Sequence, residues 1–255
     1  MLLDLTKTKF DIIIAAGQSN CEGWGVGDVV EPYSPNDRIW SMEQDFSICT
    51  AHEKTDGKYT VGSFPLIFAS EYFNKYLESD RHLLLINTAI GGTGFVPNAE
   101  KITWRKGELL STRMLEMVKA ALELHEENRV VAFLWHQGEQ EVLCNTPPNQ
   151  HFNNMTELFD DVQKNFGTNV PFILGDFVEE WKLEQGKKAI DIANTNRQIA
   201  EKYNGFFVNT EGLTSNRKEV KDFTAADGII HFSRKALYEL GKRYFQKYSI
   251  IPKNH

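Results

Sequence analysis

Short apolar segments alternate with longer amphipathic ones along this chain of 255 residues. Five segments are apolar on both faces, as buried strands of a parallel sheet are, and they span residues 10–16, 82–88, 130–135, 171–175 and 206–209. Apolar residues three and four positions apart predict helices that begin near Pro65 and Leu110 and helices over 151–166, 187–203 and 233–248. Strands that alternate with helices indicate βαβ units, so we expect an α/β fold, a three-layer α/β/α sandwich.

Nothing in the sequence divides the chain, because it has no linker-like stretch, internal repeat or low-complexity segment. We therefore expect residues 1–255 to form a single domain. Residues 20–62 depart from the alternation, since they are rich in Gly, Pro and Asp and show little periodicity. Loops of that length are uncommon unless they carry function. We expect this segment to be a loop-rich insertion folded over one edge of the functional site.

The charge balance argues against nucleic acid as a partner. Lys and Arg number 28 and Asp and Glu 35, a net charge of −7, whereas nucleic-acid-binding proteins carry a basic footprint. No apolar run approaches the ~18 residues of a membrane span, so no membrane partner is expected. Residues 1–10 lack the layout of a signal peptide, which predicts a cytoplasmic location. The sequence does not fix the oligomeric state.

The cysteines and histidines do not follow metal-binding spacing. Cys21, Cys49 and Cys144 are too few and too scattered for a disulfide framework. The histidines other than His231 lack ligand spacing with Cys or carboxylates. We therefore expect no metal site.

Four polar clusters lie where the predicted fold would bring them to one edge of the sheet. Ligands of open α/β sheets bind beyond the carboxyl ends of the strands. Three clusters follow the first three predicted strands, and the fourth precedes the last predicted helix. They are Gly17-Gln18-Ser19-Asn20, Ile90-Gly91-Gly92-Thr93-Gly94, His136-Gln137-Gly138-Glu139 and Asp227-Gly228-Ile229-Ile230-His231-Phe232.

These clusters contain the groups that acyl transfer requires. A serine hydroxyl is a poor nucleophile until a base removes its proton. Ser19 can be the nucleophile and His231 the base, while Asp227 can hold the imidazole in the required tautomer. An oxyanion also needs hydrogen-bond donors. The candidate donors are the backbone N–H groups of Gly91, Gly92 and Ser19 and the side-chain amide of Gln137.

In this order, Gly-Gln-Ser-Asn, Gly-Gly-Thr, Trp-His-Gln-Gly-Glu and Asp…His-Phe-Ser span residues 11–248 and resemble the SGNH (GDSL-like) hydrolases. More narrowly, the chain is similar to the sialate O-acetylesterase and acetylxylan-esterase-like branch of carbohydrate esterases. In that branch Gly-Gln-Ser-Asn replaces the Gly-Asp-Ser motif and Trp-x-Gln-Gly-Glu replaces Gly-x-Asn-Asp. The resemblance implies a flavodoxin-like fold with a five-stranded parallel sheet in the order 2-1-3-4-5, and neither a metal nor an organic cofactor.

The resemblance also implies a role for individual residues. Ser19 would be the nucleophile and His231 the base. The oxyanion hole would consist of the backbone N–H groups of Ser19 and Gly92 and the side chain of Gln137.

The spacing around the candidate acid departs from the family pattern. The family has Asp-x-x-His, whereas Asp227 and His231 are one residue further apart. Asp227 can still reach the histidine through a bulged loop that Gly228 allows. The alternatives are a Ser-His dyad or another orienting acid, namely Glu139, Glu141 or Asp222.

Together these observations predict a serine esterase that removes O-acetyl groups from a carbohydrate through an acyl-enzyme. The expected partner is a small-molecule or oligosaccharide acetyl ester of the sialic acid or xylan type. Two alternatives stay open: a broad short-chain lipase or thioesterase of the same superfamily, and a non-catalytic glycan-binding protein. Trp104, in a polar loop, is the candidate for stacking against a sugar, whereas Trp135 ends a buried strand and is expected in the core.

Overall fold

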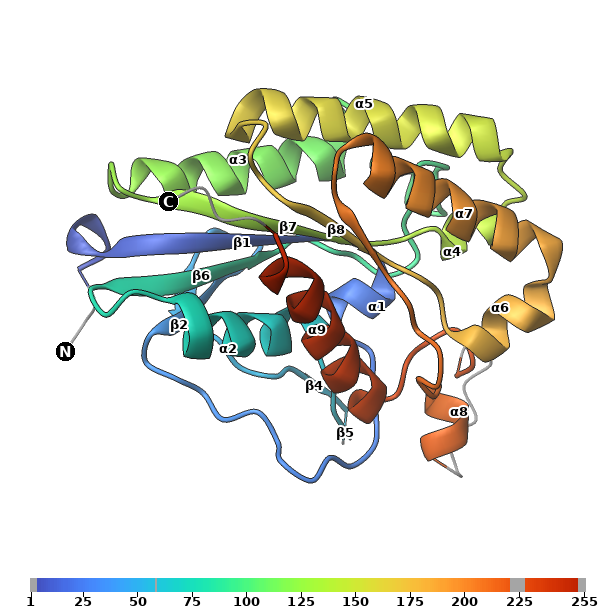
Figure 1. The fold of residues 1–255 in the computed structure, drawn as a ribbon, viewed down its shortest axis with the longest axis horizontal. Helices are drawn as coiled ribbons and strands as arrows, with labels where there is room; N and C mark the ends of the chain where they lie inside the picture. The colour runs from blue at the N-terminus through green and yellow to red at the C-terminus, as the bar shows by residue number, and fades with distance from the viewer. Residues whose placement is uncertain (1–3, 58, 221–227, 252–255) are drawn as a thin grey trace.

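A seven-stranded sheet lies at the centre of the fold (Figure 1). The structure is a computed structural model, and it describes residues 4–57, 59–220 and 228–251. Its strands follow the order β3-β2-β6-β1-β7-β8-β9. They are β1 (Lys9–Gly17), β2 (Ile39–Met42), β3 (Ile48–Thr50), β6 (Arg81–Asn87), β7 (Arg129–His136), β8 (Phe172–Gly175) and β9 (Phe206–Val208). A separate hairpin pairs β4 (Thr55–Asp56) with β5 (Tyr59–Thr60).

The prediction of a five-stranded, wholly parallel sheet is wrong in the number of strands and in their direction. The five predicted strands form β6-β1-β7-β8-β9, all parallel. Residues 39–50 of the predicted insertion add two strands at the open edge of β6. There β2 runs parallel to β6 and pairs Ile39 with Leu83, and β3 returns antiparallel, with Trp40 opposite Thr50. The insertion therefore extends the sheet, because an open strand edge offers unpaired backbone groups to a neighbouring segment.

Helices cover both faces of the sheet (Figure 1). They are α1 (Ser19–Glu22), α2 (Phe64–Tyr76), α3 (Leu109–Glu123), α4 (Glu139–Leu143), α5 (Pro148–Phe166), α6 (Glu179–Gln185), α7 (Lys187–Lys202), α8 (Asn216–Glu219) and α9 (Arg234–Ser249), preceded by a 3₁₀ turn at Leu5–Lys7. The five predicted helices are confirmed as α2, α3, α5, α7 and α9. Ser233 caps α9, since its hydroxyl accepts the Ala236 N–H at 3.1 Å.

Alternate residues of β1 divide the core into two layers. Ile13 and Ala15 pack with residues of α2 and α9, whereas Ile12 and Ile14 pack with residues of α3 and α5. All four side chains are completely buried. β1 therefore lies at the centre of the molecule, and the residues that follow it are held by rigid structure on both sides.

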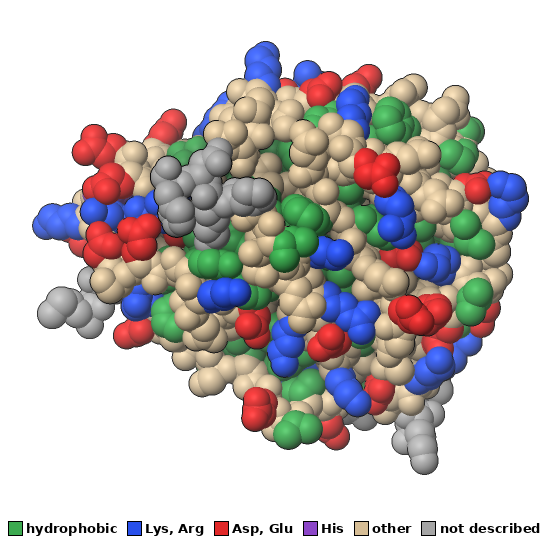
Figure 2. All heavy atoms as spheres, viewed as in Figure 1, with side chains coloured by type: hydrophobic (Ala, Val, Ile, Leu, Met, Phe, Trp, Pro, Cys, Tyr) green, Lys and Arg blue, Asp and Glu red, His purple; other side chains and the backbone are tan. Residues whose placement is uncertain are grey.

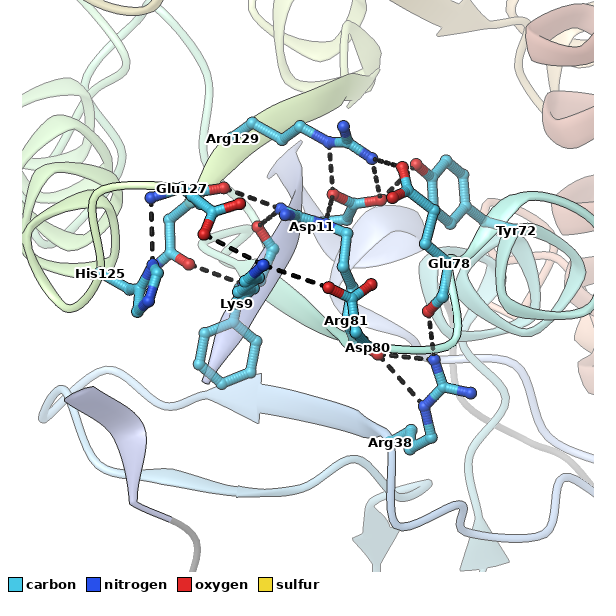
Figure 3. Close-up of polar contacts among 12 residues, drawn as sticks. Lys9, Asp11, Arg38, Tyr72, Glu78, Asp80, Arg81, His125, Glu127 and Arg129 are labelled. Carbon is cyan, nitrogen blue, oxygen red and sulfur yellow. Dashed lines mark hydrogen bonds and ion pairs between the residues drawn. The ribbon is translucent and has the colours of Figure 1, made fainter. Parts of the chain in front are cut away.

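A buried ionic network fixes the amino ends of the central strands (Figure 3). Asp11, which has no exposed surface, accepts hydrogen bonds from Arg81 Nε at 2.7 Å, Arg129 Nε at 2.6 Å and the Tyr72 hydroxyl at 2.7 Å. These partners come from β6, β7 and α2. The network therefore ties three strands and a helix together at the end of β1 remote from Ser19.

The charge distribution on the surface and the composition of the helices are relevant to nucleic acid and membrane as partners. Acidic and basic side chains are interspersed over the face drawn in Figure 2, without a broad area of one sign. Across residues 4–57, 59–220 and 228–251, no helix combines the length and the apolar composition that a membrane crossing requires.

Candidate active site

Ser19 stands at the carboxyl end of the central strand. β1 ends at Gly17, and α1 begins with Ser19 two residues later. Gly17 has φ +138°, and a Cβ there would collide with the backbone carbonyl of His136. Only glycine therefore permits the turn after β1 to pass this close to the end of β7. The turn leaves Ser19 6% exposed at the start of α1, where the first N–H groups of a helix have no partner inside the helix.

The glycine pair after β6 lies beside the serine. A Cβ on Gly91 would lie 3.6 Å from the Cβ of Ser19. The Gly91 N–H donates to Oε2 of Glu22 at 2.7 Å and is therefore already used. Gly92 is exposed, has φ +66°, and a Cβ there would meet nothing within 4 Å. Of the two glycines, Gly92 is thus the one whose surroundings leave room for a substrate oxygen.

Gln137 is held more tightly than the sequence indicates. Its side chain is completely buried, and its Nε2 donates to the Glu141 carboxylate and lies 3.5 Å from the Thr93 carbonyl. The other oxygen of Glu141 accepts the Phe95 N–H at 2.6 Å. Glu141 therefore links the loop after β7 to the loop after β6. Gln137 is the first residue after β7, and its Nε2 also donates to Gln18 Oε1 at 3.4 Å, so the amide is surrounded by acceptors.

His231 belongs to the segment 228–233, here called the histidine loop. The residue is buried, with 7% of its surface exposed. Asn20 holds the chain on both sides of it, because Oδ1 accepts the Phe232 N–H and Nδ2 donates to the Ile230 carbonyl, each at 3.0 Å. The residue after Ser19 thus binds both sequence neighbours of His231. The structure therefore brings the candidate nucleophile and base together through a single buried asparagine.

Glu139 lies behind Asn20. It is completely buried, and its Oε1 accepts a hydrogen bond from Asn20 Nδ2 at 2.8 Å. Burial raises the pKa of Glu139 to about 7, and the charges of Glu141 and Asp176 add to this effect. Glu139 therefore acts on the histidine loop through Asn20. Of the other three acid candidates, Glu141 is bonded to Gln137 and to the Phe95 N–H, and Asp227 and Asp222 lie outside the described residues.

The tryptophans differ from expectation. Trp104 is completely buried and donates its indole N–H to the Gly17 carbonyl at 3.0 Å, so its expected role as a sugar platform is wrong. It supports the turn before Ser19 instead. Trp24, which the sequence reasoning missed, is 38% exposed, and its ring lies nearly parallel to that of His231 with centroids 6.2 Å apart. Its position in Gly-Trp-Gly, just after the serine motif, is the only signal that the sequence offers.

The described residues add neither a reactive thiol at Cys21 nor a metal-binding cluster to this site. Cys21 is buried in the core, and burial raises the pKa of its thiol. Within the described ranges, no group of three or more His, Cys, Asp or Glu side chains could hold a metal ion.

The structure thus places Ser19 after the first strand of a mostly parallel sheet flanked by helices, and His231 just before the last helix. The family described as "SASA: Carbohydrate esterase, sialic acid-specific acetylesterase" matches residues 9–250. The chain therefore belongs to this family of carbohydrate esterases, whose members are hydrolases of carboxylic esters.

Known proteins resemble the chain in sequence and in fold. The probable carbohydrate esterase At4g34215 of Arabidopsis thaliana is 29% identical over 171 residues, which are 60% of this chain and 62% of that protein. The chain thus matches about three-fifths of the length of this relative. The crystal structure of NanS has a TM-score of 0.77 at 17% identity, over 95% of this chain and 97% of that one. The X-ray structure of the Arabidopsis protein has a TM-score of 0.71 at 22% identity, over 94% and 97%.

A more distant structure shares the same fold. A catalytic mutant of Axe2, an acetylxylan esterase from Geobacillus stearothermophilus, has a TM-score of 0.55 at 14% identity, over 94% of this chain and 95% of that one. At these identities the structural likenesses establish the fold.

Proposed function

We propose that this chain, acting as a single domain, is a serine esterase that removes O-acetyl groups from a carbohydrate. The observation that carries the proposal is the attachment of the histidine loop to Asn20, the residue next to Ser19, in a member of a carbohydrate esterase family. The substrate class is an acetylated small sugar or oligosaccharide of the sialic acid or xylan type. The names of the relatives, a probable carbohydrate esterase and an acetylxylan esterase, support this class.

In the proposed reaction, Ser19 Oγ attacks the acetyl carbonyl carbon while His231 takes the hydroxyl proton. The tetrahedral intermediate then expels the sugar oxygen, and His231 returns the proton to it. This leaves an acetyl ester on Ser19. A water molecule, deprotonated by His231, then attacks this ester. The second tetrahedral intermediate expels Ser19 Oγ, His231 returns the proton to that oxygen, and acetic acid leaves.

The negative charge of the intermediate would be stabilised by three donors. Two would be the backbone N–H groups of Ser19, at the start of α1, and of Gly92, which follows the glycine beside the serine and has open space around its Cα. The Gln137 amide donates to Glu141, and Gln18 Oε1 and the Thr93 carbonyl also accept from its Nε2, at 3.4 and 3.5 Å, so it would bind the oxyanion by exchanging one of these longer bonds. Donors aimed at the developing charge stabilise the transition state more than the substrate, and each contributes about 3 kcal/mol.

Asp227 is the proposed orienting acid, and a Ser-His dyad is the alternative. The hydrogen bonds from Asn20 already fix the backbone on both sides of His231. An acid would therefore be needed mainly to select the imidazole tautomer and to stabilise its charged form. Replacing Asp227 with alanine separates the two cases, since a dyad would keep most of its rate.

The test compares wild type with Ser19→Ala, His231→Ala and Asp227→Ala on 4-nitrophenyl acetate and on an O-acetylated xyloside. We expect both Ser19→Ala and His231→Ala to lose at least about 1,000-fold in kcat/KM. An intact rate in Ser19→Ala would refute the serine mechanism. Faster hydrolysis of octanoyl than of acetyl esters would favour the lipase alternative. Binding of glycans without turnover of any ester would favour the non-catalytic one.

A further inference from the structure

Trp24 is the exposed tryptophan of this chain. Three of the five tryptophans, Trp104, Trp135 and Trp181, are buried, and Trp40 is partly buried, whereas Trp24 keeps 38% of its surface exposed. A large aromatic side chain exposed beside a candidate catalytic residue loses hydrophobic stabilisation unless something covers it. The question is therefore what Trp24 binds.

The indole ring is held in place before any ligand arrives. Its Nε1–H donates to Oε2 of Glu22 at 2.8 Å, the same oxygen that accepts the Gly91 N–H. The Trp24 carbonyl accepts a hydrogen bond from Asn216 Nδ2 at 2.9 Å, and Val26 N–H donates to Asn216 Oδ1 at 2.8 Å. A side chain fixed in this way loses little conformational entropy on binding.

The indole ring of Trp24 lies near both candidate catalytic residues, Ser19 and His231. A Cβ on Gly91 would lie 3.6 Å from Ser19 Cβ and 3.7 Å from Trp24 Nε1, so the serine and the indole border the same point. The ring is also nearly parallel to His231, with an interplanar angle of 21°. In the proposed reaction His231 protonates the leaving oxygen, so the sugar must lie on the histidine side of the ester. That is the side on which Trp24 stands.

We propose that Trp24 is the platform that binds the pyranose ring carrying the acetyl group, with Glu22 holding the indole. The ring presents an apolar surface to the C–H groups of a sugar. The Glu22 carboxylate has acceptor capacity beyond its two present bonds, and it can accept a hydrogen bond from a sugar hydroxyl. This inference rests on the proposed esterase function and adds the residue that distinguishes sugar acetates from simple ones.

The test measures kcat and KM for a mono-O-acetylated methyl xyloside and for ethyl acetate, which has no sugar ring. We expect Trp24→Ala to lower kcat/KM for the sugar ester about 10- to 100-fold, mainly through KM, and that for ethyl acetate less than about 3-fold. Trp24→Phe keeps an aromatic ring, so its kcat/KM for the sugar ester should lie between those of wild type and Trp24→Ala. Trp40→Phe, the same change on β2, is the matched control and should leave the ratio of the two substrates unchanged.

Equal losses on both esters in Trp24→Ala, or an altered pH profile on ethyl acetate, would show that Trp24 only positions His231 and would overturn the proposal. An unchanged ratio in an active variant would also overturn it. Failure of the wild type to hydrolyse either ester would instead refute the proposed esterase function. The rate on ethyl acetate reports that each variant is folded, so an inactive misfolded variant cannot be mistaken for support.

Discussion

Replacing Glu139 with glutamine should change how the stability of this protein depends on pH. Glu139 is completely buried, and burial raises its pKa to about 7. The neighbouring charges of Glu141 and Asp176 raise the pKa further, and the hydrogen bond from Asn20 opposes the shift. The carboxyl group is therefore largely neutral in the folded protein below pH 7, whereas in the unfolded chain it ionises near its ordinary value of 4.5.

The sign of the effect follows from proton binding. The folded state holds the proton of Glu139 over a pH range in which the unfolded state has lost it, so low pH favours folding. This contribution is complete below pH 4.5 and is lost as the pH rises through about 7. The shift between these values corresponds to about 3 kcal/mol of unfolding free energy. Glutamine does not titrate, so the variant lacks this contribution at every pH.

The hydrogen bonds around residue 139 make glutamine a close replacement. The Tyr244 hydroxyl donates to the Trp135 carbonyl at 3.0 Å, so it must accept from His136 Nδ1, also at 3.0 Å. His136 Nε2 is then an unprotonated acceptor, 4.0 Å from Oε1 of Glu139. A glutamine keeps the oxygen that accepts from Asn20, and its amide nitrogen takes the place of Oε2, for which the described residues provide no hydrogen-bond partner. The variant is therefore expected to fold and to retain its activity.

The assay is urea unfolding of wild type and Glu139→Gln between pH 4.5 and 8. The free energy of unfolding of the wild type, relative to the variant, should fall by about 3 kcal/mol over this range and be flat above it. Glu157→Gln, the same change at an exposed position of α5, is the control and should run parallel to wild type. Parallel curves for wild type and Glu139→Gln would refute the argument that the buried carboxyl is neutral.

Two further substitutions test opposite ends of β1. Asp11→Asn removes the charge that pairs with buried Arg81 (Figure 3) and should lower the unfolding free energy by about 3 kcal/mol or more without changing kcat. A loss below about 1 kcal/mol in urea unfolding would contradict the structural role of the network. Asn20→Ala removes the hydrogen bonds that hold the histidine loop. Because small misplacements of catalytic groups lower the rate, kcat on 4-nitrophenyl acetate should fall at least about 10-fold with little change in KM. A kcat equal to that of wild type would show that the loop keeps its conformation without these bonds.

The strands and helices that pack on the core could be predicted from the sequence. All nine residues of β1 except Lys9 are buried, and such a run has one plausible structure in an alternating chain. The polar clusters could also be assigned to one edge, because the carboxyl ends of parallel strands meet there. The position of the candidate site thus followed from topology, whereas the roles of its residues stay predictions.

The edge strands could not be predicted, because their pairing depends on another strand. β2 has only four residues and β3 only three, and most of these are half-buried. Neither has an alternating pattern long enough to indicate a strand. They form where β6 leaves its edge open, and this tertiary contact has no signal in the local sequence.

The two tryptophans were misjudged for a related reason. Polar neighbours around Trp104 indicated a surface loop, yet the ring is buried beneath the serine turn, where the Gly17 carbonyl and the Thr93 hydroxyl oxygen accept its N–H. Trp24 lies in the segment 20–62 that was expected to fold over one edge of the site, but the sequence did not single it out. Its contact with His231 joins segments far apart in sequence, and only the folded chain reveals it.

A single hydrogen-bond system joins the motifs, and it accounts for residues in them that do no chemistry. Asn20 of the first motif binds Glu139 of the third and both neighbours of His231 in the fourth. Asn20, Glu139 and Phe232 are completely buried, and their polar groups need partners from another segment, so the loss of one leaves the next unsatisfied, at about 1 to 3 kcal/mol. Asn20 and Glu139 therefore belong to the site as Ser19 does. They fix the backbone beside Ser19 and on both sides of His231, the proposed nucleophile and base, whose spacing would set the rate of acyl transfer.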